Sequence, residues 1–182
     1  RAIADLLFGK ESPSGKLPVT FYESLEELPE FTDYSMKGRT YRYMEGKAQF
    51  PFGYGLTYSN VKVENAEVRQ CGRKITVEAE VYNKGNADTE EVVQVYVKNL
   101  DSKNAIPNPA LGGFQRIFIK AGERRKVMVP VWEKAFTVVN ENGERVEDGR
   151  KYEIFAGCSQ PDERSIELTG TEPVKIIWEK ED

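Results

Sequence analysis

The sequence predicts a mainly β fold for residues 60–182, a sandwich of two antiparallel sheets. Three observations favour it. Apolar residues recur at every second position through most of this part, which is the period of a strand with one buried face. Turn residues interrupt the pattern at regular intervals, and no stretch with a helical period separates the strands. We therefore expect two sheets that bury one face each against the other.

The individual strands follow from the same alternation. The clearest is "KITVEAEVYN" at residues 74–83, and "EVVQVYVKN" and "RRKVMVPV" alternate valines in the same way. Pro130 lacks an N–H and predicts that the last of these lies at a sheet edge. The apolar phase slips between Val63 and Ala66, which predicts a one-residue bulge. Further strands are expected in "RIFIK", "KYEIFAG", "RSIELTG" and "VKIIWE", and the outward phase carries Tyr96, Phe118, Met128 and Phe155.

Six or seven short strands of this kind are typical of a Greek-key sandwich of the immunoglobulin or fibronectin III type. In that topology Cys71 follows the first strand and Cys158 follows the sixth, at opposite ends of the sandwich. A disulfide needs Cα atoms within about 7 Å of each other. We therefore expect two free thiols.

Residues 1–59 lack this alternation. The chain begins at Arg1 rather than Met, and "RAIADLLFG" has the pattern of a helix end closed by Gly9, so we expect a piece of a longer protein. "GKLPVTFY" then alternates apolar residues as a short strand does. Residues 1–22 thus form one αβ unit, which cannot bury its own faces. Residues 23–59 are too long for an ordinary loop and are interpreted as a strap laid across another surface, with one helical turn in "ESLEELPEF" and an extended "GRTYRYMEG".

Composition excludes several classes of function. The formal charge of −4 and the pI near 5.2 leave no basic stripe for nucleic acid. No apolar run reaches the ~20 residues that span a bilayer, so no membrane partner is expected. The absence of histidine removes Ser-His-Asp and Cys-His catalysis and the usual nitrogen ligand of zinc. We expect no metal site and no cofactor.

Several motifs, in order, resemble family 3 glycoside hydrolases. "GKESPSGKLPVTFY" is similar to the closing αβ piece of the second, α/β sandwich domain of that family, and "FPFGYGLTYS" is similar to its "PFGYGLSY" signature. "EVVQVYVKN", "LGGFQRIFIKAGERRKV" and "IELTG" resemble successive landmarks of its fibronectin III-like domain. The resemblance divides the chain into an α/β domain remnant at 1–22, a linker or strap at 23–59 and a fibronectin III-like sandwich at 60–182. "IPNPALGGF" and "GCSQ" depart from the usual runs, which affects only the expected surface of the sandwich.

The resemblance implies a retaining β-glycosidase as the intact protein, acting on β-linked oligosaccharides such as terminal β-glucosides or β-xylosides. In the family an Asp nucleophile lies on an N-terminal barrel and a Glu acid/base on the α/β sandwich domain, and the chemistry needs both. Neither motif is present, so we expect no catalytic residue in this chain and no activity of the chain alone. Its partners are then the missing barrel and α/β domains, and a periplasmic or extracellular location is slightly favoured.

The best candidates for substrate contact are Arg39, Tyr41 and Arg42 in "GRTYRY", because Arg binds hydroxyls or carboxylates and Tyr offers a face to a sugar ring. This segment resembles the version in the xylosidase-like branch of the family. The competing interpretation, which we favour, is a purely structural strap. The adjacent acids at 26–27, 90–91 and 162–163 lie in charge-rich stretches and are interpreted as surface residues rather than as a catalytic pair.

The "PFGYGLTYS" segment contains three aromatic residues and two glycines but no catalytic group. We interpret Phe52, Tyr54 and Tyr58 as rings that lock an interdomain corner, with Gly53 and Gly55 letting the backbone turn there. Stacking of these rings on a sugar is the alternative. For the whole chain, the alternative to an accessory part of a glycosidase is an independent carbohydrate-binding or adhesion module.

Overall fold

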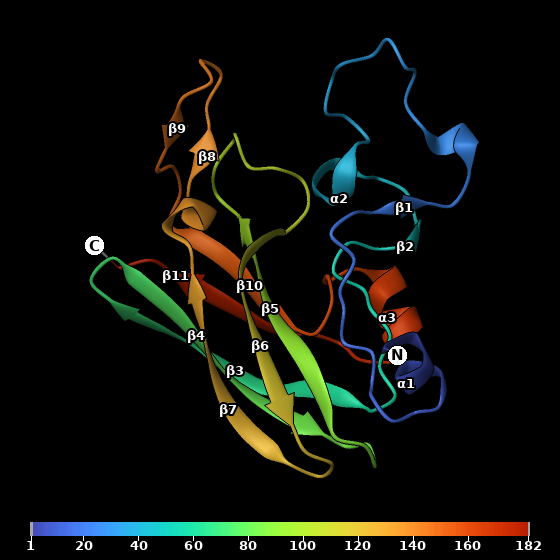
Figure 1. The fold of residues 1–182 in the computed structure, drawn as a ribbon. Helices are drawn as coiled ribbons and strands as arrows, with labels where there is room; N and C mark the ends of the chain where they lie inside the picture. The colour runs from blue at the N-terminus through green and yellow to red at the C-terminus, as the bar shows by residue number, and fades with distance from the viewer. Residues whose placement is uncertain (1, 182) are drawn as a thin grey trace.

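A computed structural model describes residues 2–181 and contains a sandwich of two antiparallel sheets (Figure 1). One sheet has the order β3-β4-β7, and the other has the order β11-β10-β5-β6. The mainly β sandwich, preceded by a short αβ segment and an extended linker, is therefore confirmed. The strands are β3 (Val61–Cys71), β4 (Lys74–Asn83), β5 (Thr89–Asn99), β6 (Ala110–Ile119), β7 (Arg124–Val131), β10 (Lys151–Gly157) and β11 (Val174–Glu179).

The core lies between the two sheets and consists mainly of β-branched side chains. Val77, Val81 and Val129 from one sheet are fully buried against Val93, Val95 and Ile154 from the other. Each valine that is fully buried stabilises the fold by about 1.5–3 kcal/mol relative to an exposed one. The alternation seen in the sequence thus corresponds to the inner faces of the sheets.

The strand details agree with several sequence expectations. Pro130 lies in β7, which forms an edge of its sheet. The register of β3 and β4 shifts between Val63 and Asn65, which confirms the bulge. Cys71 ends β3, Cys158 follows β10, and both are free thiols.

One expectation about the sandwich was wrong, and one residue has an unexpected environment. "RSIELTG" does not form a strand; α3 (Glu163–Thr169) begins after Asp162, whose carboxylate accepts a hydrogen bond from the Ser165 amide, and ends at Gly170 with a φ of 64°. Tyr96 lies on the outer face of β5, as its phase predicts. It is fully buried, because β5 is a central strand whose outer face is covered by the strap.

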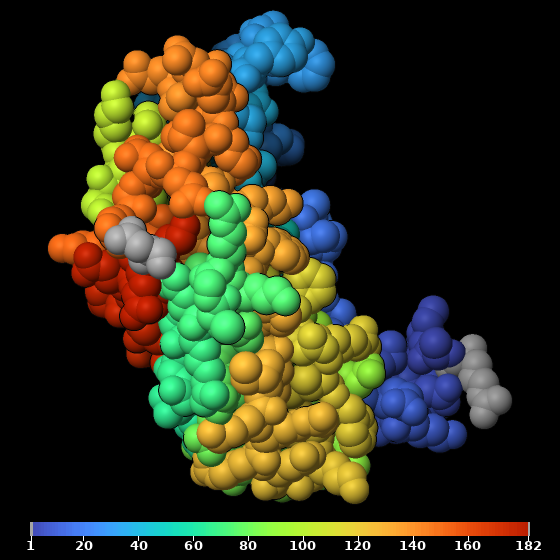
Figure 2. Space-filling model, turned by 90° about the vertical axis from the view of Figure 1, so that its left-hand side faces the viewer, coloured from blue at the N-terminus to red at the C-terminus, as the bar shows by residue number. Residues whose placement is uncertain are grey.

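The first part of the chain is mostly irregular. It contains α1 (Ala2–Leu7), β1 (Phe21–Tyr22), the 3-10 turn η1 (Leu25–Glu27), α2 (Thr40–Tyr43) and β2 (Ala48–Phe50), and β1 pairs with β2. The strand expected near residues 17–21 is shortened to Phe21–Tyr22, and "GRTYRY" forms a helical turn instead of an extended segment. In Figure 2 the α1 region (dark blue) projects away from the sandwich as a separate knob. None of the residues of α1 is buried.

One end of the sandwich carries a cluster of connecting segments. These are the loop at residues 100–109, the 3-10 turn η2 (Glu133–Phe136) and the hairpin of β8 (Val138–Val139) and β9 (Arg145–Val146). Tyr152 anchors them from below, because its hydroxyl donates to the carbonyl oxygens of Phe136 and Gly149 at 3.1 and 3.0 Å. We call this end of the molecule the loop pole. None of the helices within residues 2–181 is long and apolar enough to cross a membrane.

Candidate functional site: the seam between the strap and the sandwich

The "PFGYG" backbone lies directly on the outer face of β5. Gly53 has a φ of 77°, and its carbonyl accepts a hydrogen bond from Gln94 Nε2 at 3.0 Å. Gln94 Oε1 in turn accepts a hydrogen bond from the hydroxyl of Tyr96 at 2.7 Å. A Cβ atom on Gly53 would collide with both side chains. Glycine is therefore required here by both the backbone conformation and the close approach.

Gly55 meets the first part of the chain rather than the sandwich. A Cβ atom at this position would overlap the carbonyl oxygen of Gly15. On either side of this contact, Gly53 N donates to Leu17 O and Leu17 N donates to Tyr54 O, both at 2.8 Å. The "PFGYG" segment thus binds residues 15–17 on one side and β5 on the other.

The aromatic rings form two stacks along this seam. Tyr41 stacks on Phe52 with a centroid distance of 4.2 Å, and its edge meets Tyr96. Tyr54 stacks on Phe50 at 5.9 Å, and Phe50 also contacts Phe21. The structure therefore places Phe52 and Tyr54 at contacts between segments.

Tyr58 reaches furthest toward the N-terminus. Its hydroxyl donates to the carbonyl of Leu6 in α1 at 3.0 Å, and its backbone N–H donates to Ser12 Oγ at 3.0 Å. The ring itself is half exposed. Tyr58 therefore ties α1 and the turn that follows it to the end of the strap.

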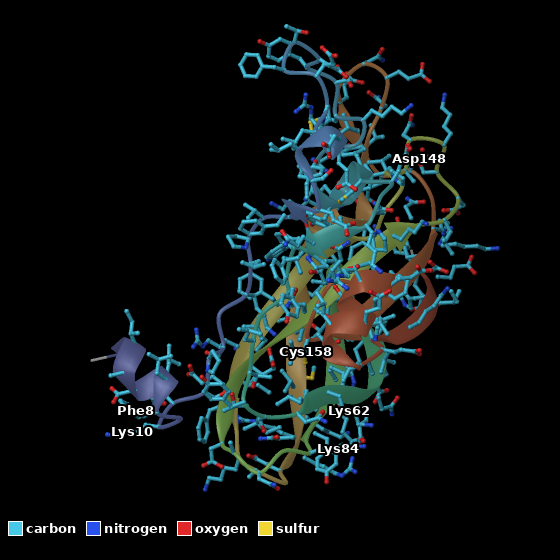
Figure 3. All side chains as sticks on the ribbon, turned by 90° about the vertical axis from the view of Figure 1, so that its right-hand side faces the viewer. Phe8, Lys10, Lys62, Lys84, Asp148 and Cys158 are labelled. Atoms are coloured by element: carbon cyan, nitrogen blue, oxygen red, sulfur yellow. The ribbon has the colours of Figure 1, made fainter. Side chains whose placement is uncertain are left out.

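A buried ion pair joins the same two parts. Lys16 Nζ lies 2.7 Å from Glu91 Oε1, and the two side chains are only 13% and 3% exposed. Glu91 Oε1 also accepts a hydrogen bond from the Val92 amide at 2.8 Å. Cys158 lies nearby, and burial, reinforced by the Glu91 charge, raises the pKa of its thiol (Figure 3). A thiol of this kind stays protonated and unreactive.

Tyr41, one of the predicted substrate contacts, has a packing role in this structure. It is buried, one face is covered by Phe52, and the Arg42 guanidinium lies 5.8 Å from its ring centroid. Its hydroxyl accepts a hydrogen bond from the Leu111 amide at 3.0 Å. Substrate contact stays a prediction for Arg39, Tyr41 and Arg42, which all line the same groove.

Arg39 holds the protruding part of the strap together. Its guanidinium donates to the carbonyl oxygens of Ser35 and Glu30, at 3.0 and 3.3 Å, and to that of Asp33. Hydrogen bonds from Ser35 lower the pKa of the Asp33 carboxyl, and the Arg39 charge adds to this effect. Arg39 is therefore occupied with backbone carbonyls of its own loop.

Arg42 is exposed and forms no ion pair with any residue between 2 and 181. It lines an open groove of about 1180 Å³ between the strap and the sandwich edge, together with Arg39, Phe52 and Trp132. Asn108 fixes the turn that carries Arg42, because its side-chain amide donates to the carbonyls of Tyr41 and Met44 at 2.9 and 2.8 Å. Of the predicted contact residues, Arg42 is the one available to a ligand.

Three of the adjacent acids are held in separate structural contacts. Glu90 pairs with Arg116, Glu91 pairs with Lys16, and Asp162 caps α3. Within residues 2–181, no group of three or more Cys, Asp or Glu side chains is arranged to hold a metal ion.

Sequence reasoning missed Lys16, Gln94 and Asn108, whose contacts build the seam. All three are polar residues whose partners are distant in the sequence, and the local pattern around Lys16 and Asn108 gives no indication of these contacts. The one available signal was Gln94, a polar residue in the otherwise valine-rich run "VVQVYV" of a central strand.

Comparisons with known proteins agree with this arrangement. The sequence model of the glycosyl hydrolase family 3 C-terminal domain matches residues 1–58, and that of the fibronectin type III-like domain matches residues 91–160. The xylan 1,4-beta-xylosidase of Xylanibacter ruminicola is 41% identical over 174 residues, which are 93% of this chain and 20% of that protein. The periplasmic beta-glucosidase of Salmonella typhimurium is 32% identical over 172 residues, which are 86% and 22% of the two chains.

Solved structures are similar over the same region. The family 3 β-glucosidase of Bifidobacterium adolescentis superposes with a TM-score of 0.79 at 28% identity, covering 97% of this chain and 27% of that one. The β-glucosidase of Kluyveromyces marxianus gives a TM-score of 0.78 at 28% identity, covering 98% and 22%. The chain spans about a fifth of the length of the curated relatives it matches. The chain therefore belongs to the family 3 glycoside hydrolases, as the end of their C-terminal domain joined to their fibronectin type III-like domain.

Proposed function

We propose that this chain is the structural C-terminal part of a retaining family 3 β-glycosidase that hydrolyses terminal β-glucosides or β-xylosides. Its own task is to complete the α/β domain and to fix that domain to the fibronectin-like sandwich. The proposal names both β-glucosides and β-xylosides as substrates because the two curated relatives described above are named as a xylosidase and a glucosidase.

The observation that carries this proposal is the apolar surface of residues 3–58. Thirteen of the twenty large apolar side chains that are exposed within residues 2–181 belong to this part. Phe31 and Tyr34 are 93% and 89% exposed, and Ile3, Leu7 and Phe8 of the α1 region are similarly bare. Exposed apolar surface of this extent marks a contact with other protein. An independent sugar-binding module has no use for such a surface, which disfavours the alternative function.

The reaction itself is assigned to the part of the intact protein that precedes this region. A retaining mechanism needs two carboxylates about 5–5.5 Å apart, one to attack the anomeric carbon and one to protonate the leaving oxygen. Of the adjacent acids, Glu90 pairs with Arg116, Glu91 pairs with Lys16 and Asp162 caps α3. What this chain supplies is the fixed position of the α/β domain, through the contacts of residues 15–17 with "PFGYG" and Glu91.

A chimera tests the proposal. Residues 1–182 replace the matching C-terminal part of the Xylanibacter ruminicola relative, and nitrophenol release from aryl β-xyloside and aryl β-glucoside is measured. We expect activity from the chimera and none from the 182-residue chain alone. A chimera with Lys16→Met should keep the same substrate preference but unfold at a lower temperature, since only the junction is changed. Hydrolysis by the chain alone, or a soluble and folded chimera without activity, would contradict the proposal.

A further inference from the structure

A second cavity, of about 280 Å³, lies at the loop pole beside the groove described above. Its walls come from the α2 turn of the strap, the loop at residues 100–109, η2 and the β8–β9 hairpin, together with the adjoining ends of β5 and β6. Figure 1 shows these segments together at the top of the molecule, and Figure 2 shows the hairpin (orange) beside the 100–108 loop (yellow-green) with the strap behind. Loops held on the end of a rigid sandwich are a common place for binding sites.

The charged residues that line this cavity are all positive. Arg42, Lys134 and Arg145 line it, and no Asp or Glu is among its lining residues. None of the three forms an ion pair with another residue of the described range 2–181. Asp148, labelled in Figure 3, does not line the cavity, and its carboxylate accepts hydrogen bonds from the Ser102 hydroxyl and the Asn104 amide. Three unpaired cations at one cavity of an acidic protein favour an anionic ligand.

Neighbouring groups hold the three cationic side chains in place at the cavity. Arg145 Nη1 donates to Thr137 Oγ1 at 2.9 Å, and Lys134 Nζ lies 5.4 Å from the ring centroid of Trp132. Arg42 extends from a turn that Asn108 holds by two hydrogen bonds. A planar guanidinium on each side suits the two oxygens of a carboxylate.

The rest of the cavity suits a sugar ring. Trp132 is 41% exposed and is braced from the side by Phe114, with ring planes at 87°. An exposed indole face packs against the apolar face of a pyranose. The side-chain oxygen of Asn104 accepts no hydrogen bond from residues 2–181 and can accept one from a hydroxyl. Small-ligand sites usually measure about 300–1,000 Å³, and the volume of this cavity lies close to the lower end of that range. The cavity therefore has room for a single sugar ring.

We propose that this cavity binds a uronic acid residue of a saccharide, with its carboxylate between Arg42 and Arg145 and its ring against Trp132. Lys134 adds to the positive potential. The proposal does not depend on the proposed function, because such a site would equally serve a glycosidase or a free-standing module.

The test compares two ligands that differ only in the carboxylate. Binding of methyl β-glucuronide and methyl β-glucoside to the 182-residue chain is followed by calorimetry and by amide NMR shifts. We expect saturable binding of the glucuronide, a glucoside affinity at least roughly tenfold lower, and shifts confined to the loop pole. Arg145→Gln, Arg42→Gln and Trp132→Ala should each weaken glucuronide binding by roughly tenfold or more.

Lys120→Gln is the matched control, because it removes the same charge at the turn of residues 120–123, at the other end of the sandwich from the loop pole. It should leave glucuronide affinity unchanged. Inorganic phosphate is the third ligand, and it should compete only weakly. Equal affinity for the two glycosides, phosphate binding as tight as that of the glucuronide, or no effect of Arg145→Gln in a folded variant would each overturn the proposal.

Discussion

The Lys16–Glu91 pair offers the sharpest test of how the first part of the chain is held. Its charged atoms are 2.7 Å apart. At an effective dielectric constant of about 20 their attraction is about 6 kcal/mol. Much of this offsets the cost of taking both charges out of water, but removing one partner leaves the other buried and unpaired. Lys16→Met should therefore lower the free energy of unfolding by about 3–5 kcal/mol.

Urea unfolding of the wild-type chain, Lys16→Met, Glu91→Met and the double variant measures this directly. The double variant replaces the pair by two apolar side chains of similar size, so it should recover most of the loss. Lys103→Met is the control, since Lys103 and Glu141 form a pair of similar length whose side chains are 77% and 81% exposed. It should cost less than about 1 kcal/mol. A Lys16→Met loss no larger than that of the control would refute the reasoning, because water would then reach Glu91 freely.

Three further predictions concern the seam, the loop pole and α1. Gly55→Ala should destabilise the chain by about 1–3 kcal/mol, because the new methyl group collides with the Gly15 carbonyl. Gly46→Ala is the control, since there is open space around Gly46, and it should cause no such loss. Thermal unfolding of both variants measures the difference. Tyr152→Phe should cost about 1–3 kcal/mol in urea unfolding at neutral pH, since it leaves the carbonyls of Phe136 and Gly149 without their donor. Burial raises the pKa of Tyr152 to about 12, while an unfolded tyrosine titrates near 10. The stability that protonated Tyr152 contributes is therefore complete below pH 10 and is lost as the pH rises from about 10 to about 12. Urea unfolding at pH 9 and pH 11 should show this loss in the wild-type chain and not in Tyr152→Phe. Backbone amides of α1 should exchange with solvent far faster than those of β4, as hydrogen exchange of the monomeric chain can establish; equal protection would count against a missing protein partner.

The sandwich was predictable because its signal is local. Val77, Val81, Val93 and Val95 alternate with polar residues, and burial of one strand face requires that alternation whatever the topology. The bulge after Val63 was visible for the same reason, since a slip of one residue changes the phase of the pattern.

The sequence was ambiguous where one local pattern is compatible with two structures. In "RSIELTG" the residues Ile166 and Leu168 alternate as in a strand, yet Asp162 and Gly170 provide the cap at each end of a helix and their effect prevails. Tyr96 occupies the phase opposite to the core valines, which indicates the other face of β5. Alternation cannot tell whether a second layer of chain covers that face, and here the strap does.

The two sides of the strap differ in the kind of interaction they can make. Toward the sandwich, Gln94 and Asn108 donate hydrogen bonds to its backbone carbonyls, so its path is set largely by hydrogen bonds that tolerate changes of side chain elsewhere. Toward solvent, Phe31 and Tyr34 carry apolar surface without a polar partner. Hydrogen bonds are directional and fix an orientation, whereas apolar burial is non-directional and supplies free energy. A strap that is hydrogen-bonded to the sandwich on one side and packed against another domain on the other side would fix the orientation of that domain relative to the sandwich. Substitutions in the seam should therefore change the geometry of the intact enzyme more than substitutions in the sandwich core.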